Sequence, residues 1–243
     1  MTDIHCHILP AYDDGAADLE ESLEMARIAL ASGVRDLVVT PHFRGEPEAL
    51  SRIPLLVERY RELRAALRRE EIPLRLHLGA EILCLPQTIR MARQKNLPTL
   101  GNTNYLLCEF QFGESPVFMN KILEGLHAAG YRIVVAHPER YDAVQKDLSL
   151  AAYWFRQGYA LQVNKGSVLG SFGPRVQQTG EELLEKGYAH FLATDAHGSL
   201  YRTPDMSQLR AWVRMHCSPE YGALLLEENP ARLLRGEDPE NPG

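Results

Sequence analysis

The 243-residue sequence lacks several features that would define common protein classes. No stretch approaches the roughly 18 consecutive apolar residues of a membrane-spanning helix, and the N-terminus MTDIHCHILP lacks the basic and apolar regions of a secretory leader. Basic residues number 26 against 32 acidic ones, so the net charge is −6, and the sequence has no basic stretch of the kind that binds a nucleic-acid backbone. We therefore predict a cytoplasmic protein without membrane insertion or a nucleic-acid partner.

Cysteine pairs and glycine-rich nucleotide motifs are also missing. Cys6, Cys84, Cys108 and Cys217 are scattered without a C-x-x-C pair, which excludes a disulfide framework, a zinc ribbon and a thioredoxin-like site. Neither GxGxxG nor GxxxxGK[ST] occurs, so a nucleotide-binding fold has no support. The composition, 45% hydrophobic and 24% charged, is that of an ordinary globular chain.

Short apolar runs alternate with stretches of helical periodicity along the chain. Runs such as DLVVT and RIVVA are almost continuously hydrophobic, as strands buried on both faces of a parallel sheet require. Seven strand–helix units predict an α/β fold, a parallel barrel forming one domain over residues 1–235. The acidic, Pro- and Gly-containing tail, residues 236–243, is predicted to be disordered. The predicted strands are 2–6, 36–40, 76–81, 105–110, 132–136, 159–163 and 190–194.

The helices are predicted from apolar side chains at steps of three and four. Asp18 and Glu21 form a capping-box pattern before a helix that begins near Leu19, and Pro116 begins another that ends before Gly130. Further helical patterns cover 56–67, 146–157, 176–187, 205–216 and 219–235.

Histidines and acids stand at the carboxyl ends of six of the seven predicted strands. Residues two apart on a strand share a face, so His5 and His7 converge, as do Asp195 and His197. In a parallel barrel these ends meet at one mouth, where divalent cations would compensate the clustered charges. The set predicts a metal centre from His5, His7, His42, Glu81, Glu109, His137, Asp195 and His197, whereas His77, His127, His190 and His216 are predicted to be structural.

Other residues near the predicted mouth admit two interpretations. Cys6 lies between two predicted ligands, but strand parity points it away from them, so we expect a core residue rather than a nucleophile. Arg140, three residues after His137, is predicted to bind phosphoryl oxygens; the alternative is a surface ion pair with Glu139. The segment around Lys165 contributes polar contacts to the mouth or is a solvated loop.

The stretches DIHCHILPAYDDGA, VVTPHF, GAEI, CEF, AHPERY and TDAHG resemble the PHP (polymerase and histidinol phosphatase) superfamily. They are most similar to its bacterial tyrosine-phosphatase branch, associated with control of capsule and exopolysaccharide, and the resemblance extends from residue 3 to about residue 232. It implies a distorted seven-stranded (β/α)7 barrel that holds three divalent transition-metal ions, manganese being expected and iron or zinc being the alternatives.

The resemblance also implies how the ligands divide among the ions. His5, His7, Glu81 and Asp195 would hold the first ion, and Glu81, Glu109 and His137 the second. His42 and His197 would hold the third together with an acid from Asp13-Asp14. We favour Asp14, with Asp13 as the alternative.

The expected reaction is hydrolysis of a phosphomonoester by water activated at the metals. Arg140, His42, His197 and Asp195 are the predicted catalytic residues, with His42 or His197 as proton donor to the leaving group. The expected partner is a phosphotyrosine protein, a bacterial tyrosine autokinase that controls capsule or exopolysaccharide synthesis. The alternatives are a small-metabolite phosphatase, such as a histidinol phosphatase, and a non-catalytic regulator that binds the kinase. A C–N hydrolase is disfavoured because no lysine ends the fourth predicted strand.

Overall fold

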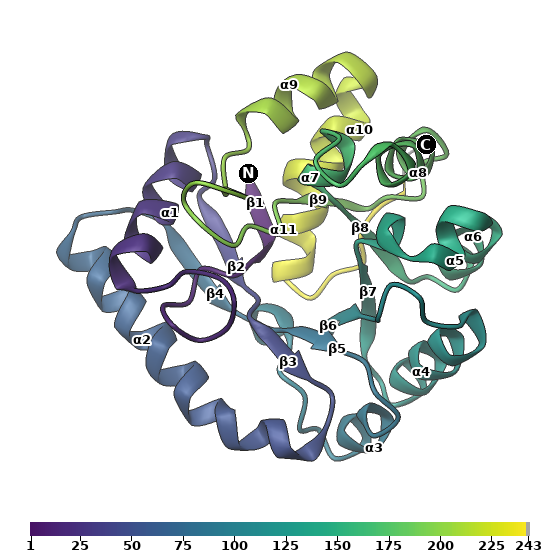
Figure 1. Ribbon diagram of the computed structural model, residues 1–243, viewed down its shortest axis with the longest axis horizontal. Coiled ribbons are helices and arrows are strands. Elements are labelled where there is room, and N and C mark those ends of the chain that lie inside the picture. Colours follow the sequence, from purple (N-terminus) through teal and green to yellow (C-terminus); the bar gives the residue numbers. More distant parts are fainter. Residues whose placement is uncertain (242–243) are drawn as a thin grey trace.

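A computed structural model describes residues 1–241, in which parallel strands lie at the centre and helices surround them (Figure 1). The strands form two sheets, of order β1-β2-β4 and β3-β5-β6-β7-β8-β9, and every pairing within them is parallel. The strands are β1 (Thr2–Cys6), β2 (Asp36–Val39), β3 (His42–Arg44), β4 (Arg75–Leu78), β5 (Glu81–Leu83), β6 (Tyr105–Glu109), β7 (Arg132–Ala136), β8 (Ala160–Asn164) and β9 (Phe191–Ala193).

Two interruptions make the strand pattern differ from the seven predicted strands. Pro41 separates β2 from β3, because proline has no N–H to donate to a neighbouring strand. Gly79 lies between β4 and β5, where an added Cβ would come within 2.9 Å of Leu100 and 3.0 Å of Val38. The predicted strands 36–40 and 76–81 therefore end early, and His42 and Glu81 begin new strands of the six-stranded sheet.

The first and last strands come together beside these interruptions. Cys6 forms a parallel bridge with Ala196, and the amide of Asp195 donates to the carbonyl of His5 over 2.9 Å. Among residues 1–241 the strands thus form two parallel sheets joined at this bridge, whereas the predicted single seven-stranded barrel is not observed as one sheet.

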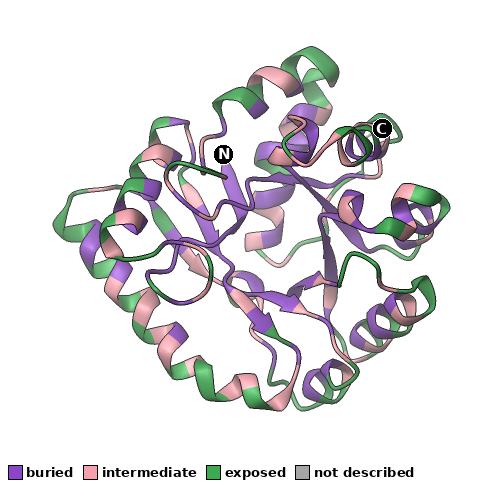
Figure 2. Ribbon diagram, viewed as in Figure 1, coloured by how far each residue is buried: buried purple, intermediate pink, exposed green. Residues whose placement is uncertain are grey.

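Helices cover the outside of the strands, with their exposed faces turned outward (Figure 2). Both predicted helix starts are capped: Asp18 accepts from the Glu21 amide over 2.9 Å, and Ser115, which precedes Pro116, accepts from the Phe118 amide over 3.3 Å. None of the described helices is long and apolar enough to cross a membrane. The α-helices are α1 (Leu19–Ala31), α2 (Ile53–Arg69), α3 (Thr88–Arg93), α4 (Pro116–Ala128), α5 (Asp142–Lys146), α6 (Ser149–Arg156), α7 (Lys165–Val168), α8 (Pro174–Glu185), α9 (Ser207–His216), α10 (Pro219–Ala223) and α11 (Asn229–Leu234). The 3₁₀-helices are η1 (Pro47–Arg52), η2 (Leu100–Asn102) and η3 (Pro138–Arg140), and η4 (Leu224–Glu228) is a π-helix.

Residues 236–241, for which we expected disorder, pack against the amino-terminal ends of the strands. The Tyr105 hydroxyl donates to the carbonyl of Glu237 over 2.8 Å, and Arg132 Nε lies 3.2 Å from Asp238. Asn229 accepts from the Glu240 amide over 2.7 Å. These hydrogen bonds hold a segment whose composition alone suggested no core contact; residues 242 and 243 lie outside the described chain.

Candidate metal centre

The eight histidines and acids predicted from the strand ends gather at one end of the parallel strands. Glu81, only 1% exposed, lies among them. Its carboxylate oxygens are 2.8 Å from His137 Nε2, 3.0 Å from His42 Nδ1 and 3.3 Å from the Nε2 atoms of both His5 and His7. One buried carboxylate therefore faces four imidazoles that come from three parts of the chain: the end of β1, the start of β3 and the residue after β7.

Two positions of the cluster have unusual backbone geometry. His137 and Asp195 follow β7 and β9 with φ angles of 33° and 49°, in the left-handed region that non-glycine residues seldom adopt. Such conformations are held in place by their surroundings and gather at functional sites. Here each one ends a strand and turns the chain at the cluster.

The adjacent acids Asp13 and Asp14 have different surroundings. The side chain of Asp13 is only 5% exposed, and it accepts hydrogen bonds from His7 Nδ1 over 2.8 Å and from the His42 amide over 2.9 Å. Asp14 is exposed, with Oδ1 3.4 Å from His42 Nε2 and 3.6 Å from His197 Nε2. Asp13 thus orients a histidine, while Asp14 offers a free oxygen to the cluster.

Gly15 lets the segment that carries both acids lie close to His7. A Cβ added at Gly15 would come within 2.0 Å of the His7 carbonyl oxygen, which accepts a hydrogen bond from the Ala16 amide. Only glycine fits this approach. The DDG sequence therefore folds back over the end of β1.

Two arginines face Asp195 at the edge of the cluster. Arg140 Nη1 lies 3.5 Å from Asp195 Oδ2, and Arg202 Nη2 lies 2.6 Å from the same oxygen. The alternative pairing of Arg140 with Glu139 does not form, because Glu139 is buried and accepts from Ser167 and from the Asn164 amide. Arg202 was missed by sequence reasoning, since it lies in an irregular segment; the only available signal was its place five residues after His197.

Aromatic rings hold Arg140 from two sides. Its guanidinium carbon lies 4.3 Å from the ring centre of Phe112 and 4.6 Å from that of Phe172. Stacking of this kind restricts the guanidinium to one plane beside Asp195. Phe112, 41% exposed, also presents apolar surface next to the cluster.

Lys165 connects two segments near the cluster. Its ammonium group donates to the carbonyl of Asp205 over 3.0 Å and also to that of Thr203. Burial lowers the pKa of this lysine. Lys165 is therefore not part of a plain solvated loop: it begins α7, and its ammonium group donates to two backbone carbonyls.

The electrostatics of the cluster are dominated by burial and by the close carboxylates. Burial opposes protonation of His5, yet the carboxylates of Glu81 and Asp195 raise its pKa to about 9. Burial and the Glu81 carboxylate raise the pKa of Glu109 to about 8. Burial and the facing His7 ring lower the pKa of His197 to about 4. The pKa values of His5 and Glu109 are thus raised and that of His197 is lowered, and such perturbed values are typical of functional sites.

The donor set fits metal ions on geometric grounds. Two ligands bound about 2.0–2.1 Å from one ion lie about 2.8–3.4 Å apart at angles between square and tetrahedral. The Nε2 atoms of His5 and His7 are 3.3 Å apart, and each is 3.3 Å from a Glu81 oxygen. Three groups have donor atoms within 4.8 Å of one another: His5, His7 and Glu81; His42, Glu81 and Glu109; and His7, Asp14, His42 and His197.

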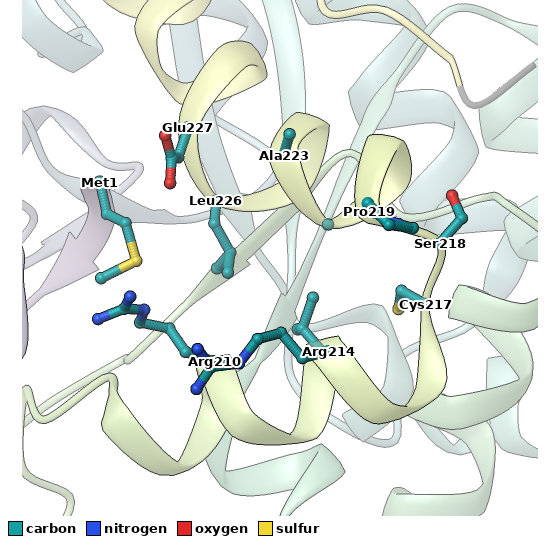
Figure 3. Close-up of a pocket in the computed structure, with 11 residues that line it drawn as sticks. Met1, Arg210, Arg214, Cys217, Ser218, Pro219, Ala223, Leu226 and Glu227 are labelled. Carbon is teal, nitrogen blue, oxygen red and sulfur yellow. The ribbon is translucent and has the colours of Figure 1, made fainter.

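Among the described residues, neither the other histidines nor the cysteines belong to the groups of close donor atoms. His77 contacts Asp36 over 2.9 Å, and His216 stacks on Trp212 at 4.3 Å, as expected for structural residues. Cys6 is fully buried, and burial raises its pKa, which disfavours a reactive thiolate. A cavity of about 390 Å³ lies beside α9 and α10, lined by Met1, Arg210, Arg214 and Leu226 among others, and none of its lining residues belongs to the cluster (Figure 3).

Fold and site together define an α/β protein whose parallel strands carry a cluster of groups able to hold metal ions. The family described as "Capsular polysaccharide synthesis, CpsB/CapC" matches residues 1–235. The chain is 35% identical to tyrosine-protein phosphatase YwqE of Bacillus subtilis, over 98% of this chain and 92% of that one. It is 32% identical to CapC of Staphylococcus aureus, over 86% of this chain and 82% of the other.

A solved structure agrees with these matches. It comes from work on YwqE of Bacillus subtilis and CpsB of Streptococcus pneumoniae, described there as metal-dependent tyrosine phosphatases. The superposition gives a TM-score of 0.87 with 34% identity and covers 100% of this chain and 97% of the other. The chain belongs to the CpsB/CapC family, which confirms the resemblance inferred from the motifs.

Proposed function

We propose that this protein is a metal-dependent phosphatase that removes phosphate from tyrosine side chains of a protein. The observation that carries the proposal is the pair of guanidiniums, Arg140 and Arg202, beside a buried cluster of histidines and carboxylates. Guanidinium groups match phosphoryl oxygens in geometry and charge. The relatives named tyrosine phosphatases support the choice of substrate.

Three divalent ions would occupy the cluster, with manganese expected and iron or zinc as alternatives. His5, His7, Glu81 and Asp195 would hold one, Glu81, Glu109 and His137 a second, and Asp14, His42 and His197 a third. The geometric groups support this division in part, although His7 also lies near the third set and His42 near the second. When bound, the ions would neutralise phosphoryl oxygens and lower the pKa of water.

The chain's own residues would bind and orient the phosphate. Arg140, stacked between Phe112 and Phe172, and Arg202 would exchange part of their contact with Asp195 for the phosphoryl oxygens. Of the two histidines expected near the leaving group, His42 is the more accessible, with 37% of its side chain exposed against 10% for His197. A leaving phenolate, with a pKa of about 10, needs this proton less than an alkoxide would.

The substrate we propose is a phosphotyrosine in an accessible segment of a bacterial tyrosine autokinase that controls capsule or exopolysaccharide synthesis. The family description and the branch-level resemblance support the capsule connection. Phe112 could contact the phenyl ring, because it is 41% exposed and touches Arg140. A cytoplasmic location would place the enzyme with such a substrate.

The deciding experiment compares kcat/KM on a phosphotyrosine peptide, a phosphoserine peptide and histidinol phosphate, all with added Mn²⁺. We expect the phosphotyrosine peptide to be preferred and a chelator to abolish turnover. A preference for histidinol phosphate of ~10-fold or more, about 1.4 kcal/mol, would reject the tyrosine assignment but keep the hydrolase. No turnover of any of the three would favour a kinase-binding regulator.

A further inference from the structure

Within the six-stranded sheet, β8 is the strand that brings neither a histidine nor an acid to the cluster. It carries instead Gln162 and Asn164, two residues apart on one face and both fully buried. Gln162 Oε1 lies 2.8 Å from His5 Nδ1, and Gln162 Nε2 donates to Asn164 Oδ1 over 2.7 Å. Asn164 Nδ2 donates to Asp195 Oδ2 over 2.6 Å. The two amides thus connect a histidine and a carboxylate of the cluster.

The direction of every hydrogen bond in this chain follows from its Asp195 end. The oxygen of Asp195 that Asn164 contacts also faces Arg202 at 2.6 Å and Arg140 at 3.5 Å, so it is an acceptor. Asn164 must therefore present its NH₂ group to Asp195 and its carbonyl to Gln162. By the same logic Gln162 presents its NH₂ group to Asn164 and its carbonyl to His5.

A carbonyl oxygen can only accept, so the nitrogen of His5 that faces it must carry a proton. Nδ1 of His5 is then the donor, and Nε2 is the nitrogen left for other partners. Nε2 is the atom that lies 3.3 Å from His7 Nε2 and 3.3 Å from Glu81. The free nitrogen points into the donor cluster.

The series of hydrogen bonds from His5 to Asp195 is fixed at Asn164 by a buried acid, Glu139. Glu139 Oε1 accepts from the backbone amide of Asn164 over 2.9 Å and from the Ser167 hydroxyl over 2.6 Å. These bonds hold the end of β8 where α7 begins. Asn164 therefore has its main chain and its side chain fixed independently.

We propose that Gln162 and Asn164 are positioning residues for the metal centre: they keep the proton of His5 on Nδ1, turn Nε2 toward a metal ion and hold Asp195 in a fixed orientation. The inference rests on the proposed function, because it assigns a role relative to the metal ions. Hydrogen-bond partners of this kind orient metal ligands and commonly affect metal affinity by about 10–100-fold when removed.

The test measures Mn²⁺ binding by the full-length protein after chelation and dialysis. Gln162→Met keeps the length of the side chain but removes both polar contacts, and Asn164→Asp puts a second carboxylate against Asp195. We expect each to lower the affinity for one ion by about 10–100-fold. Gln178→Met, which changes an exposed glutamine bonded to Glu182, is the matched control and should bind as the wild type does.

A second readout separates positioning from a general loss of stability. In the Zn²⁺-loaded wild type, ¹⁵N-histidine NMR should show a slowly exchanging proton on His5 Nδ1, assigned with His5→Gln. In Gln162→Met this proton should exchange faster. The melting temperature of the variant should fall well below that of the wild type when metal is bound, and by much less when metal is absent.

Three results would count against the inference. Wild-type Mn²⁺ affinity in both variants would overturn it alone, as would a His5 proton on Nε2 in the loaded wild type. A wild-type protein that binds no Mn²⁺ or Zn²⁺ would overturn the proposed function and this inference together.

Discussion

The two ends of the parallel strands hold titratable side chains in opposite ways. At the amino-terminal ends the charges are paired: Asp36 binds Arg75 over 2.7 Å and His77 over 2.9 Å, and Arg132 meets Asp238 at 3.2 Å. At the carboxyl ends five carboxylates, including Glu81 and Asp195, face two guanidiniums, so the remaining charge is balanced only by protons, such as those that the raised pKa values of His5 and Glu109 retain.

This difference shows where a ligand belongs. A buried charge without a partner costs free energy, so a fold tolerates a negative cluster only where cations complete it. The paired end needs nothing further and serves stability. Substitutions at the two ends should therefore separate loss of activity from loss of stability.

Glu81→Ala should have the largest effect. It removes the carboxylate that faces four imidazoles, so we expect both phosphatase activity and bound metal to be lost. Elemental analysis should find close to three ions in the wild type and fewer in the variant. Full activity in a wild-type preparation with at most one tightly held ion would contradict the three-ion centre.

Arg140→Ala should lower turnover of phosphomonoesters by ~10²-fold, because it removes one group that stabilises developing charge. The metal content should stay at the wild-type value, since the guanidinium contacts Asp195 only at 3.5 Å. Arg140→Lys keeps the charge but not the planar fork, so its turnover should lie between those of the wild type and Arg140→Ala. Unchanged kinetics in Arg140→Ala would return this residue to a structural role.

His190→Asn should change stability in acid and leave turnover at neutral pH unaltered. Burial lowers the pKa of His190 to about 4, and Nδ1 accepts from the Leu161 amide over 3.1 Å, a bond that the asparagine oxygen can replace. Between about pH 6.5 and 4 the unfolded wild type binds a proton that the folded protein refuses, so its stability falls with falling pH.

The difference in unfolding free energy between wild type and His190→Asn should therefore shift by about 3 kcal/mol across that range, to the disadvantage of the wild type. Urea denaturation at several pH values under one metal condition measures it. A constant difference would show that His190 does not titrate as its burial requires.

Cys6→Ser should have little effect on catalysis. The thiol is fully buried and its pKa is raised by burial, so most activity should remain. A trapped phosphocysteine would overturn this expectation and the metal-dependent mechanism with it.

The sequence alone predicted the cluster better than the sheet around it. Strand ends and the alternation of side chains are local properties, so His5, His7 and Glu81 could be located from short apolar runs. Proline at position 41 is a local signal for a break, but the strand that begins at His42 depends on pairing with the distant β5. The break at Gly79 likewise depends on contacts with Leu100 and Val38, which no local pattern contains.

Residues outside regular elements were the least predictable. Arg202 has a φ of 47° in an irregular segment and reaches Asp195 only through the fold. The different surroundings of Asp13 and Asp14 likewise depend on a contact that the sequence does not contain, that of His7 with Asp13. The order of residues 236–241 arises from acceptors that Tyr105, Arg132 and Asn229 reach from other elements.

The ammonium group of Lys165 cross-links the segment after β8 to the segment that contains Arg202, Thr203 and Asp205. Phe172 lies on the first segment, and Arg202, 5.7 Å from its ring, lies on the second. We therefore expect the two segments to move together: their amide hydrogens should exchange with solvent at a common rate, and an outward movement of Arg202 should carry with it Phe172, the ring that also contacts Arg140.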